Sequence, residues 1–396
     1  MKINFEFSIL NFEWCWRAGA RRAVLIAGLL ALAACDHAPA PESNSKFKIQ
    51  NSKVSVTERG IYTGAYIDWG DKEDGVTLEK IEGFEQLVGK RQAIVASSSY
   101  WGEQNFPDAN VRMIARHGSV PLLYWSPWDR PYVEGRGPDK YSLTSIIAGT
   151  HDAYIDTWAG HARDSGTPII VSFGNEMNGS WFPWSGEHYG GGQLLGTEPA
   201  HDGQPAVFHY AGPETFVKAY RHVVDRARAR GAKNIQWAFH VMNFSDPQIH
   251  WNLAAQYYPG SDYCDWLGMS LYGSQFPADA EWAPFFPLLD WPYTELAMID
   301  PKKPIMLCEW GVADLPRLGS KAEWFRDGFR IMKDAKFSRL KAIVYWHERW
   351  QNSEGDNAGK YSNLRVNSSP EALDAYRHGV ADPFYLDAPI WKSDDR

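Results

Sequence analysis

The chain has 396 residues, of which 44% are hydrophobic and 22% are charged, as is ordinary for a globular enzyme of barrel size. The formal net charge of −8 offers no basic stripe for phosphates, which argues against nucleic acid as a partner. The 19 tryptophans are unusual, because this side chain is generally kept for cores, interfaces and flat ligands.

The first 34 residues read as an export signal. A basic stretch at 17–22 precedes an apolar run at 23–34, which is too short to span a bilayer. The ending Leu32-Ala33-Ala34-Cys35 resembles a bacterial lipobox, in which the cysteine is lipidated and becomes the mature N-terminus. A plain secretory signal with an incidental cysteine is the alternative. Either way we expect an exported protein, and in the first case one anchored by lipid in the bacterial envelope, at the periplasmic face or the cell surface.

Polar residues rich in Pro and Ser follow at 35–57 and indicate a flexible linker, so a single domain is expected at 58–390. In that domain, eight short apolar runs alternate with helical patterns. The runs begin at Ile61, Gln92, Val120, Pro168, Ile235, Asp265, Pro304 and Ala342. Most are continuously apolar, as in parallel strands buried on both faces. The pattern predicts a (β/α)₈ barrel. An open doubly wound sheet is the alternative, but no glycine fingerprint follows the first run.

Helical periodicity is clearest in three segments between these runs. Residues 77–90 repeat apolar side chains on one face, 213–231 open on proline and close on glycine, and Ser320 precedes Glu323 in capping-box spacing. The connection from 174 to 212 is much longer than usual, which is typical of a functional loop. Cys264 and Cys308 fall at opposite ends of neighbouring parallel strands, so we expect two free thiols.

Two glutamates directly follow apolar runs, at the strand ends where barrel active sites are built. Glu176 ends the fourth run and Glu309 the seventh. Strand ends are poor places for glutamate, and two carboxylates across a cleft suit glycoside hydrolysis, with one as proton donor and the other as nucleophile. The alternative is a structural glutamate paired with Arg or His.

The stretch NEMNGSWFPWSG at 175–186 resembles the acid/base motif of glycoside hydrolase family 26, which contains β-mannanases, β-glucanases and β-1,3-xylanases. Residues 257–273 and 304–311 resemble the family's sixth strand and nucleophile strand. The resemblance implies that Glu176 is the acid/base, that Glu309 is the nucleophile and that Tyr272 orients it. It also implies that Trp181 and Trp346 line the subsite of the attacked sugar.

Two positions depart from the family pattern. Asn175 stands where the family usually has His, and Ser126 stands about where mannanases tend to have another His. In the wider clan of retaining barrel hydrolases, the residue at the first position is usually Asn, which hydrogen-bonds the sugar 2-hydroxyl. Mannose and glucose differ at that hydroxyl, so the substitution concerns the choice between mannan and glucan.

Aromatic residues recur at strand exits, and we expect Trp69 and Trp125 to contact sugar as well. His240, His347 and Glu348 also lie at strand ends, with either a structural or a rim role. The chain shows no HExxH or comparable metal-site spacing, so neither a metal nor another cofactor is expected.

Together these features predict a retaining, endo-acting β-glycosidase that acts on a β-linked polysaccharide as a monomer. Endo-β-1,4-mannanase is the first reading, and β-1,3-1,4-glucanase or β-1,3-xylanase are the alternatives within the family. The alternative of another class is a polysaccharide-binding lipoprotein without activity, which would be favoured if the long loop occluded the two carboxylates.

Overall fold

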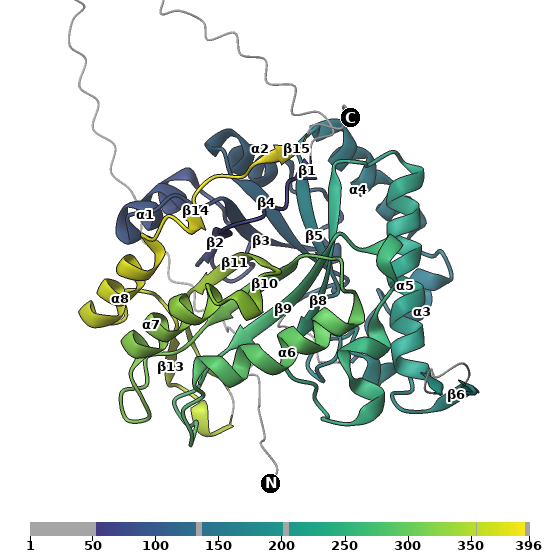
Figure 1. The fold of residues 1–396 in the computed structure, drawn as a ribbon. Coiled ribbons are helices and arrows are strands. Elements are labelled where there is room, and N and C mark those ends of the chain that lie inside the picture. The colour runs from purple at the N-terminus through teal and green to yellow at the C-terminus, as the bar shows by residue number, and fades with distance from the viewer. Residues whose placement is uncertain (1–52, 132–136, 201–205, 354, 393–396) are drawn as a thin grey trace, which may run out of the picture.

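A closed barrel of parallel strands forms the centre of the molecule, and helices surround it (Figure 1). The computed structural model describes residues 53–131, 137–200, 206–353 and 355–392. The signal segment, Cys35 and the linker as far as residue 52 lie outside this range. The barrel closes because the last strand pairs in parallel with the first, from Ala342–Tyr62 to His347–Ile67. In order around the barrel, the strands are β2 (Ile61–Ile67), β3 (Ile94–Tyr100), β4 (Val120–Ser126), β5 (Ile169–Phe173), β8 (Ile235–Met242), β9 (Trp266–Tyr272), β10 (Ile305–Gly311) and β11 (Leu340–His347).

The eight predicted runs are these eight strands, so the barrel prediction is confirmed. The helices are α1 (Leu78–Val88), α2 (Asp108–His117), α3 (Leu143–Ile147), α4 (Asp152–Ser165), α5 (Ala211–Ala229), α6 (Phe285–Ile299), α7 (Lys321–Met332) and α8 (Pro370–Val380). The predicted cap of α7 is present, because the Ser320 side chain accepts a hydrogen bond from the Glu323 amide. One crossing departs from the regular pattern. Between β8 and β9 the chain forms only short 3₁₀ turns, at His250–Asn252, Ala254–Tyr257 and Ser261–Tyr263.

Short strand pairings occur in addition to the eight strands of the barrel. They comprise β1 (Lys53–Val54) with β15 (Trp391–Lys392), β6 (Leu194–Glu198) with β7 (Val207–Tyr210), β12 (Arg349–Gln351) with β13 (Tyr361–Asn363), and β14 (Tyr385–Leu386) with β2. The first pair includes Lys53 and Val54, which were expected to belong to the flexible linker at 35–57. Val54 is buried and its amide donates to the Gln236 side chain, so Lys53 and Val54 pack as part of the folded domain. The predicted long loop carries the β6–β7 strand pair, of which β6 is labelled at the lower right of Figure 1.

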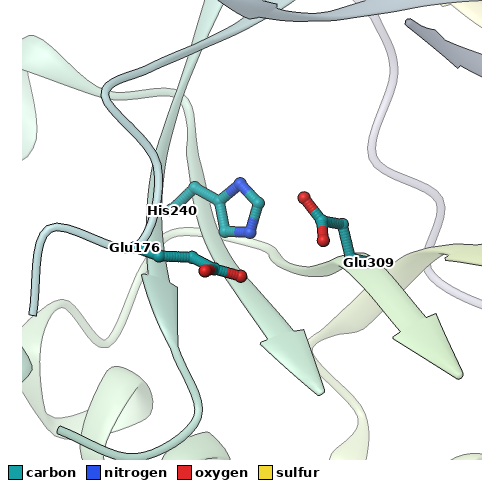
Figure 2. A group of neighbouring side chains, drawn as sticks. All are labelled: Glu176, His240 and Glu309. Carbon is teal, nitrogen blue, oxygen red and sulfur yellow. The ribbon is translucent and has the colours of Figure 1, made fainter. Parts of the chain in front are cut away.

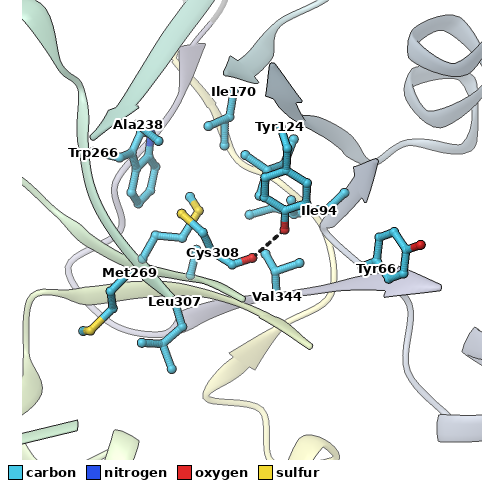
Figure 3. Close-up of a cluster of buried hydrophobic side chains, with 14 of the residues drawn as sticks. Tyr66, Ile94, Tyr124, Ile170, Ala238, Trp266, Met269, Leu307, Cys308 and Val344 are labelled. Atoms are coloured by element: carbon cyan, nitrogen blue, oxygen red, sulfur yellow. Dashed lines mark hydrogen bonds between the residues drawn. The ribbon is translucent and has the colours of Figure 1, made fainter. Parts of the chain in front are cut away.

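Alternation along each strand separates the barrel interior from the layer under the helices. Tyr124 points inward, where its hydroxyl donates a 2.8 Å hydrogen bond to the Cys308 carbonyl of β10 (Figure 3). Trp125, the next residue, points outward and stacks on Trp158 of α4, with ring centroids 4.0 Å apart. Cys264 and Cys308 are both buried and free, as expected. Within the described part of the chain, no helix has both the length and the apolar character needed to cross a membrane.

Candidate active site

Glu176 and Glu309 lie opposite each other at the carboxyl ends of the barrel strands (Figure 2). Glu309 is on β10, and Glu176 follows β5 after a turn. Glu176 itself has φ of 56°, a left-handed conformation that costs a non-glycine residue energy and that tends to persist at functional sites. Its amide donates to the His240 carbonyl at 2.8 Å, which fixes the turn against β8. The strand ends therefore aim both carboxyls into one space.

One oxygen of the Glu176 carboxyl group lies within 4.8 Å of one oxygen of the Glu309 carboxyl group. Both groups line a cavity of about 350 Å³. Retaining glycosidases hold their carboxyl groups about 5–5.5 Å apart, and inverting enzymes about 6.5–9.5 Å. Of the long loop, the described residues 186–200 and 206–212 do not line the cavity. The two carboxyl groups are thus close enough to act on one sugar unit in the same cavity.

Each carboxyl group receives its own hydrogen bond. Tyr272 of β9 donates from its hydroxyl to Glu309 Oε2 at 2.7 Å. Trp181 donates from its indole Nε1 to Glu176 Oε2, also at 2.7 Å. The two glutamates are 3% and 7% exposed, so little solvent competes for these bonds.

Burial dominates the electrostatics of the pair. It raises the pKa of Glu176, against hydrogen bonds from Ser270 and Trp181. Burial and then the neighbouring Glu176 charge raise the pKa of Glu309 well above its ordinary value, while the Tyr272 hydrogen bond lowers it. Since two charges this close in a buried site disfavour each other, ionisation of one glutamate opposes ionisation of the other.

His240 completes the group drawn in Figure 2. Its Nδ1 lies 3.0 Å from the Ser172 hydroxyl and its Nε2 lies 2.8 Å from the Ser270 hydroxyl. Burial lowers the pKa of His240 to about 3, so the ring is neutral. Although Glu176, His240 and Glu309 could together offer three ligand atoms to a metal, both ring nitrogens already have hydroxyl partners. We therefore assign His240 a positioning role through Ser270.

The two asparagines of the motif have different surroundings. Asn178 binds the chain after β8, where its Oδ1 accepts from the Met242 amide at 2.8 Å and its Nδ2 donates to the Met242 and Phe244 carbonyls. Asn175 lines the cavity, and its side chain has no hydrogen bond to any other described residue. Its amide is therefore available to a substrate hydroxyl beside Glu176.

The predicted aromatic contacts divide into two groups. Trp346 lines the cavity and stacks on Tyr66, with ring centroids 3.8 Å apart. Trp69 and Trp125 do not line it, and the expectation that they contact sugar is corrected. Trp69 is buried and donates to the Ala96 carbonyl, while Trp125 faces the helices. Trp181 touches the Glu176 carboxyl without lining the cavity.

Several lining residues were not predicted from the sequence. Glu73 is the foremost, because its carboxyl enters the cavity and accepts from Ser98 at 2.6 Å and Tyr100 at 2.9 Å. Glu348, which was expected in a structural or a rim role, also lines the cavity, and burial raises its pKa to about 8. The additional aromatic lining consists of Tyr100, Tyr124, Trp128, Phe182, Trp184, Phe276, Trp350 and Tyr361. An aromatic-walled cleft with several carboxyls and the side-chain amides of Asn175, Gln275 and Gln351 matches the hydroxyls and apolar faces of a sugar chain.

Comparisons with known proteins agree with this geometry. Residues 142–289 match the family model described as glycosyl hydrolase family 26. Endoglucanase H of Acetivibrio thermocellus is 27% identical over 324 residues, covering 81% of this chain and 30% of that protein. The β-1,3-xylanase TXYA of a Vibrio species is 23% identical over 269 residues, covering 62% of this chain and 50% of that protein. The chain thus spans about a third to a half of the length of these curated relatives.

Solved structures share the fold. The catalytic domain of a family 26 endo-β-1,4-mannanase from Bacillus sp. JAMB-750 aligns with a TM-score of 0.57 at 19% identity, covering 83% of this chain and 87% of that chain. A modular endo-β-1,4-mannanase from Cellulomonas fimi aligns with a TM-score of 0.55 at 21% identity, covering 83% and 72%. The resemblance seen in the motifs is confirmed.

Proposed function

The chain is similar to glycoside hydrolase family 26 in sequence and in fold, and we propose that it hydrolyses internal β-linkages of a polysaccharide with retention of configuration. The observation that carries the proposal is the placing of Glu176 and Glu309 across one cavity, with an oxygen of one within 4.8 Å of an oxygen of the other. Both groups line an open cleft whose aromatic walls suit sugar rings.

In the first step, a Glu309 oxygen attacks the anomeric carbon and forms an ester bond as the glycosidic carbon–oxygen bond breaks. Glu176 gives its proton to the departing oxygen. In the second step, Glu176 takes a proton from water, the water oxygen attacks the anomeric carbon, and Glu309 leaves as a carboxylate. Tyr272 holds the nucleophile by its 2.7 Å hydrogen bond, which is strongest when Glu309 is ionised.

For the substrate, we propose β-1,4-mannan first, on the strength of the motif at 175–186. Mixed-linkage β-glucan and β-1,3-xylan are favoured by two other observations. Asn175 replaces the usual family histidine beside the acid/base, and the curated relatives are an endoglucanase and β-1,3-xylanases by name.

The test is the release of reducing ends from β-mannan, mixed-linkage β-glucan, β-1,3-xylan and cellulose, with Glu309→Gln as the blank. Activity on mannan alone would support the mannanase assignment. Activity on glucan or xylan would assign the substrate that goes with Asn175. A folded protein that releases nothing from any of the four would contradict the proposal and favour a non-catalytic polysaccharide-binding role.

We further propose that the protein is an exported, monomeric lipoprotein, anchored at Cys35 in the bacterial envelope. The lipobox-like ending of residues 32–35 after an apolar run supports this. Cys35→Ser should release the protein from the membrane fraction and abolish incorporation of labelled fatty acid. Equal partition of the two forms would contradict the anchor, and a dimer mass in sedimentation would contradict the monomer.

A further inference from the structure

A second cavity lies beside the catalytic cleft, where the barrel lacks a regular helix. The segment after β8 and helix α6 enclose about 410 Å³. This volume is within the range of small-molecule sites. The cavity and the catalytic cleft share no lining residue. The lining includes Asn243, Phe244, Ile249, His250, Trp291 and Glu295.

Trp291 is the most unusual member of this lining. It projects from α6 with 69% of its surface exposed, although an exposed indole buries little apolar area. Ile249, on the opposite wall, is 49% exposed. Exposed apolar side chains that gather at a cavity indicate a contact surface, and an indole offers a flat face for the apolar side of a sugar ring.

Asn243 gives the cavity an unused hydrogen-bond acceptor. The residue is 7% exposed, and its Oδ1 has no partner among the described residues. Its Nδ2 reaches the Leu288 carbonyl only at 3.5 Å. A buried amide oxygen without a donor is destabilising, and such groups call for an explanation. The oxygen itself is sealed from solvent in this conformation, so a sugar hydroxyl would supply the donor after the side chain turns toward the cavity.

The cavity is physically linked to the acid/base. The Phe244 ring packs against Trp181 with centroids 6.1 Å apart, and Trp181 donates to the Glu176 carboxyl. Asn178 also binds the backbone of Met242 and Phe244. One rigid wall therefore has the catalytic proton donor on one side and this cavity on the other.

We infer that this cavity is a second carbohydrate-binding site, which takes a neutral sugar unit of the polysaccharide by stacking on Trp291 and hydrogen bonding to Asn243. The choice of polysaccharide rests on the proposed function, because the sugar is a unit of the polymer that the cleft cleaves. Binding here holds the polymer next to the catalytic cleft through cleavage and product release.

The test measures binding without cleavage, by the retardation of Glu309→Gln in native gels that contain each of the four polysaccharides. Adding Trp291→Ala should weaken the apparent affinity for the retarding polymer at least tenfold. Adding Met298→Ala, at a 72% exposed position of α6 that does not line the cavity, should change nothing. Trp291→Phe should restore part of the affinity, because a smaller ring still stacks. Thermal unfolding midpoints within a degree or so of one another would show that all variants are folded.

Equal retardation of the Trp291→Ala and Met298→Ala forms would overturn the inference, and so would failure of Glu309→Gln to be retarded by any polymer. The proposed function stands or falls separately on hydrolysis by the unmodified protein. Hydrolysis with no effect of Trp291→Ala leaves the function and removes the second site. Retardation that depends on Trp291, without hydrolysis, supports the site and removes the function.

Discussion

The hydroxyl of Tyr272 donates a 2.7 Å hydrogen bond to the Glu309 carboxyl, and the two residues come from neighbouring strands of the barrel. This bond favours the ionised form of Glu309 in a buried place that otherwise raises its pKa. It therefore keeps the nucleophile charged at a lower pH than burial alone would allow.

Tyr272→Phe removes that bond and should raise the pKa of Glu309 further. The acid limb of the pH profile of kcat/KM, which reports ionisation of the nucleophile, should move to higher pH, while the alkaline limb set by Glu176 should move less. A profile of unchanged shape and position, whatever its height, would show that the bond does not tune the nucleophile.

Glu176→Gln keeps the shape of the side chain and removes the transferable proton. We expect a loss of about 10²–10⁴-fold in turnover of a polysaccharide, the usual range for acid/base groups. A glycoside with a dinitrophenolate leaving group should lose much less in its first step, because that group departs without protonation. Equal losses on the two substrates would contradict the acid/base role.

Asn175 lines the cavity beside Glu176 with an unused amide. Asn175→Ala should lower kcat by about 10²-fold, as removal of one transition-state hydrogen bond does elsewhere, with a smaller change in KM. Asn175→His, which restores the usual family residue, should raise the ratio of mannan to glucan activity. Rates on both polymers that change in parallel would separate this position from specificity.

Trp125 and Trp346 test the correction to the aromatic prediction. Trp125→Ala should lower the free energy of unfolding by about 3–5 kcal/mol, because it empties the space against Trp158, and should leave KM nearly unchanged. Trp346→Ala opens the cleft wall and should raise KM. Denaturant unfolding gives the stability of the two variants, and steady-state kinetics on the same preparations give their KM. A raised KM in both variants would return Trp125 to the site.

Periodicity was sufficient to predict the strands, because eight buried runs with helical patterns between them have few other arrangements. The strand-end positions of the two glutamates could be predicted for the same reason, because Glu309 stands near the end of β10 and Glu176 follows β5 after a short turn. The error at Trp125 came from treating strand exits as equivalent. Tyr124 and Trp125 are adjacent, so alternation sends them to opposite sides of β4, and counting from Tyr124 would have placed Trp125 outside.

Glu73 could not have been predicted in this way. It comes from the irregular segment after β2 with a left-handed φ of 52°, and it enters the cleft only because Ser98 and Tyr100 of β3 hold it there. Its place depends on contacts between segments far apart in the chain, for which the local sequence carries no period. The same holds for the serines on either side of His240, which three different strands bring together.

The most direct test of the central claim is the anomeric configuration of the first product. Proton NMR during the first minutes of polysaccharide hydrolysis, before mutarotation, distinguishes the two anomers of the newly formed reducing end. A β-linked substrate should yield the β-anomer first, since two displacements at one carbon restore its configuration. An α-anomer as the first product would show inversion and would contradict the assignment of Glu309 as the nucleophile.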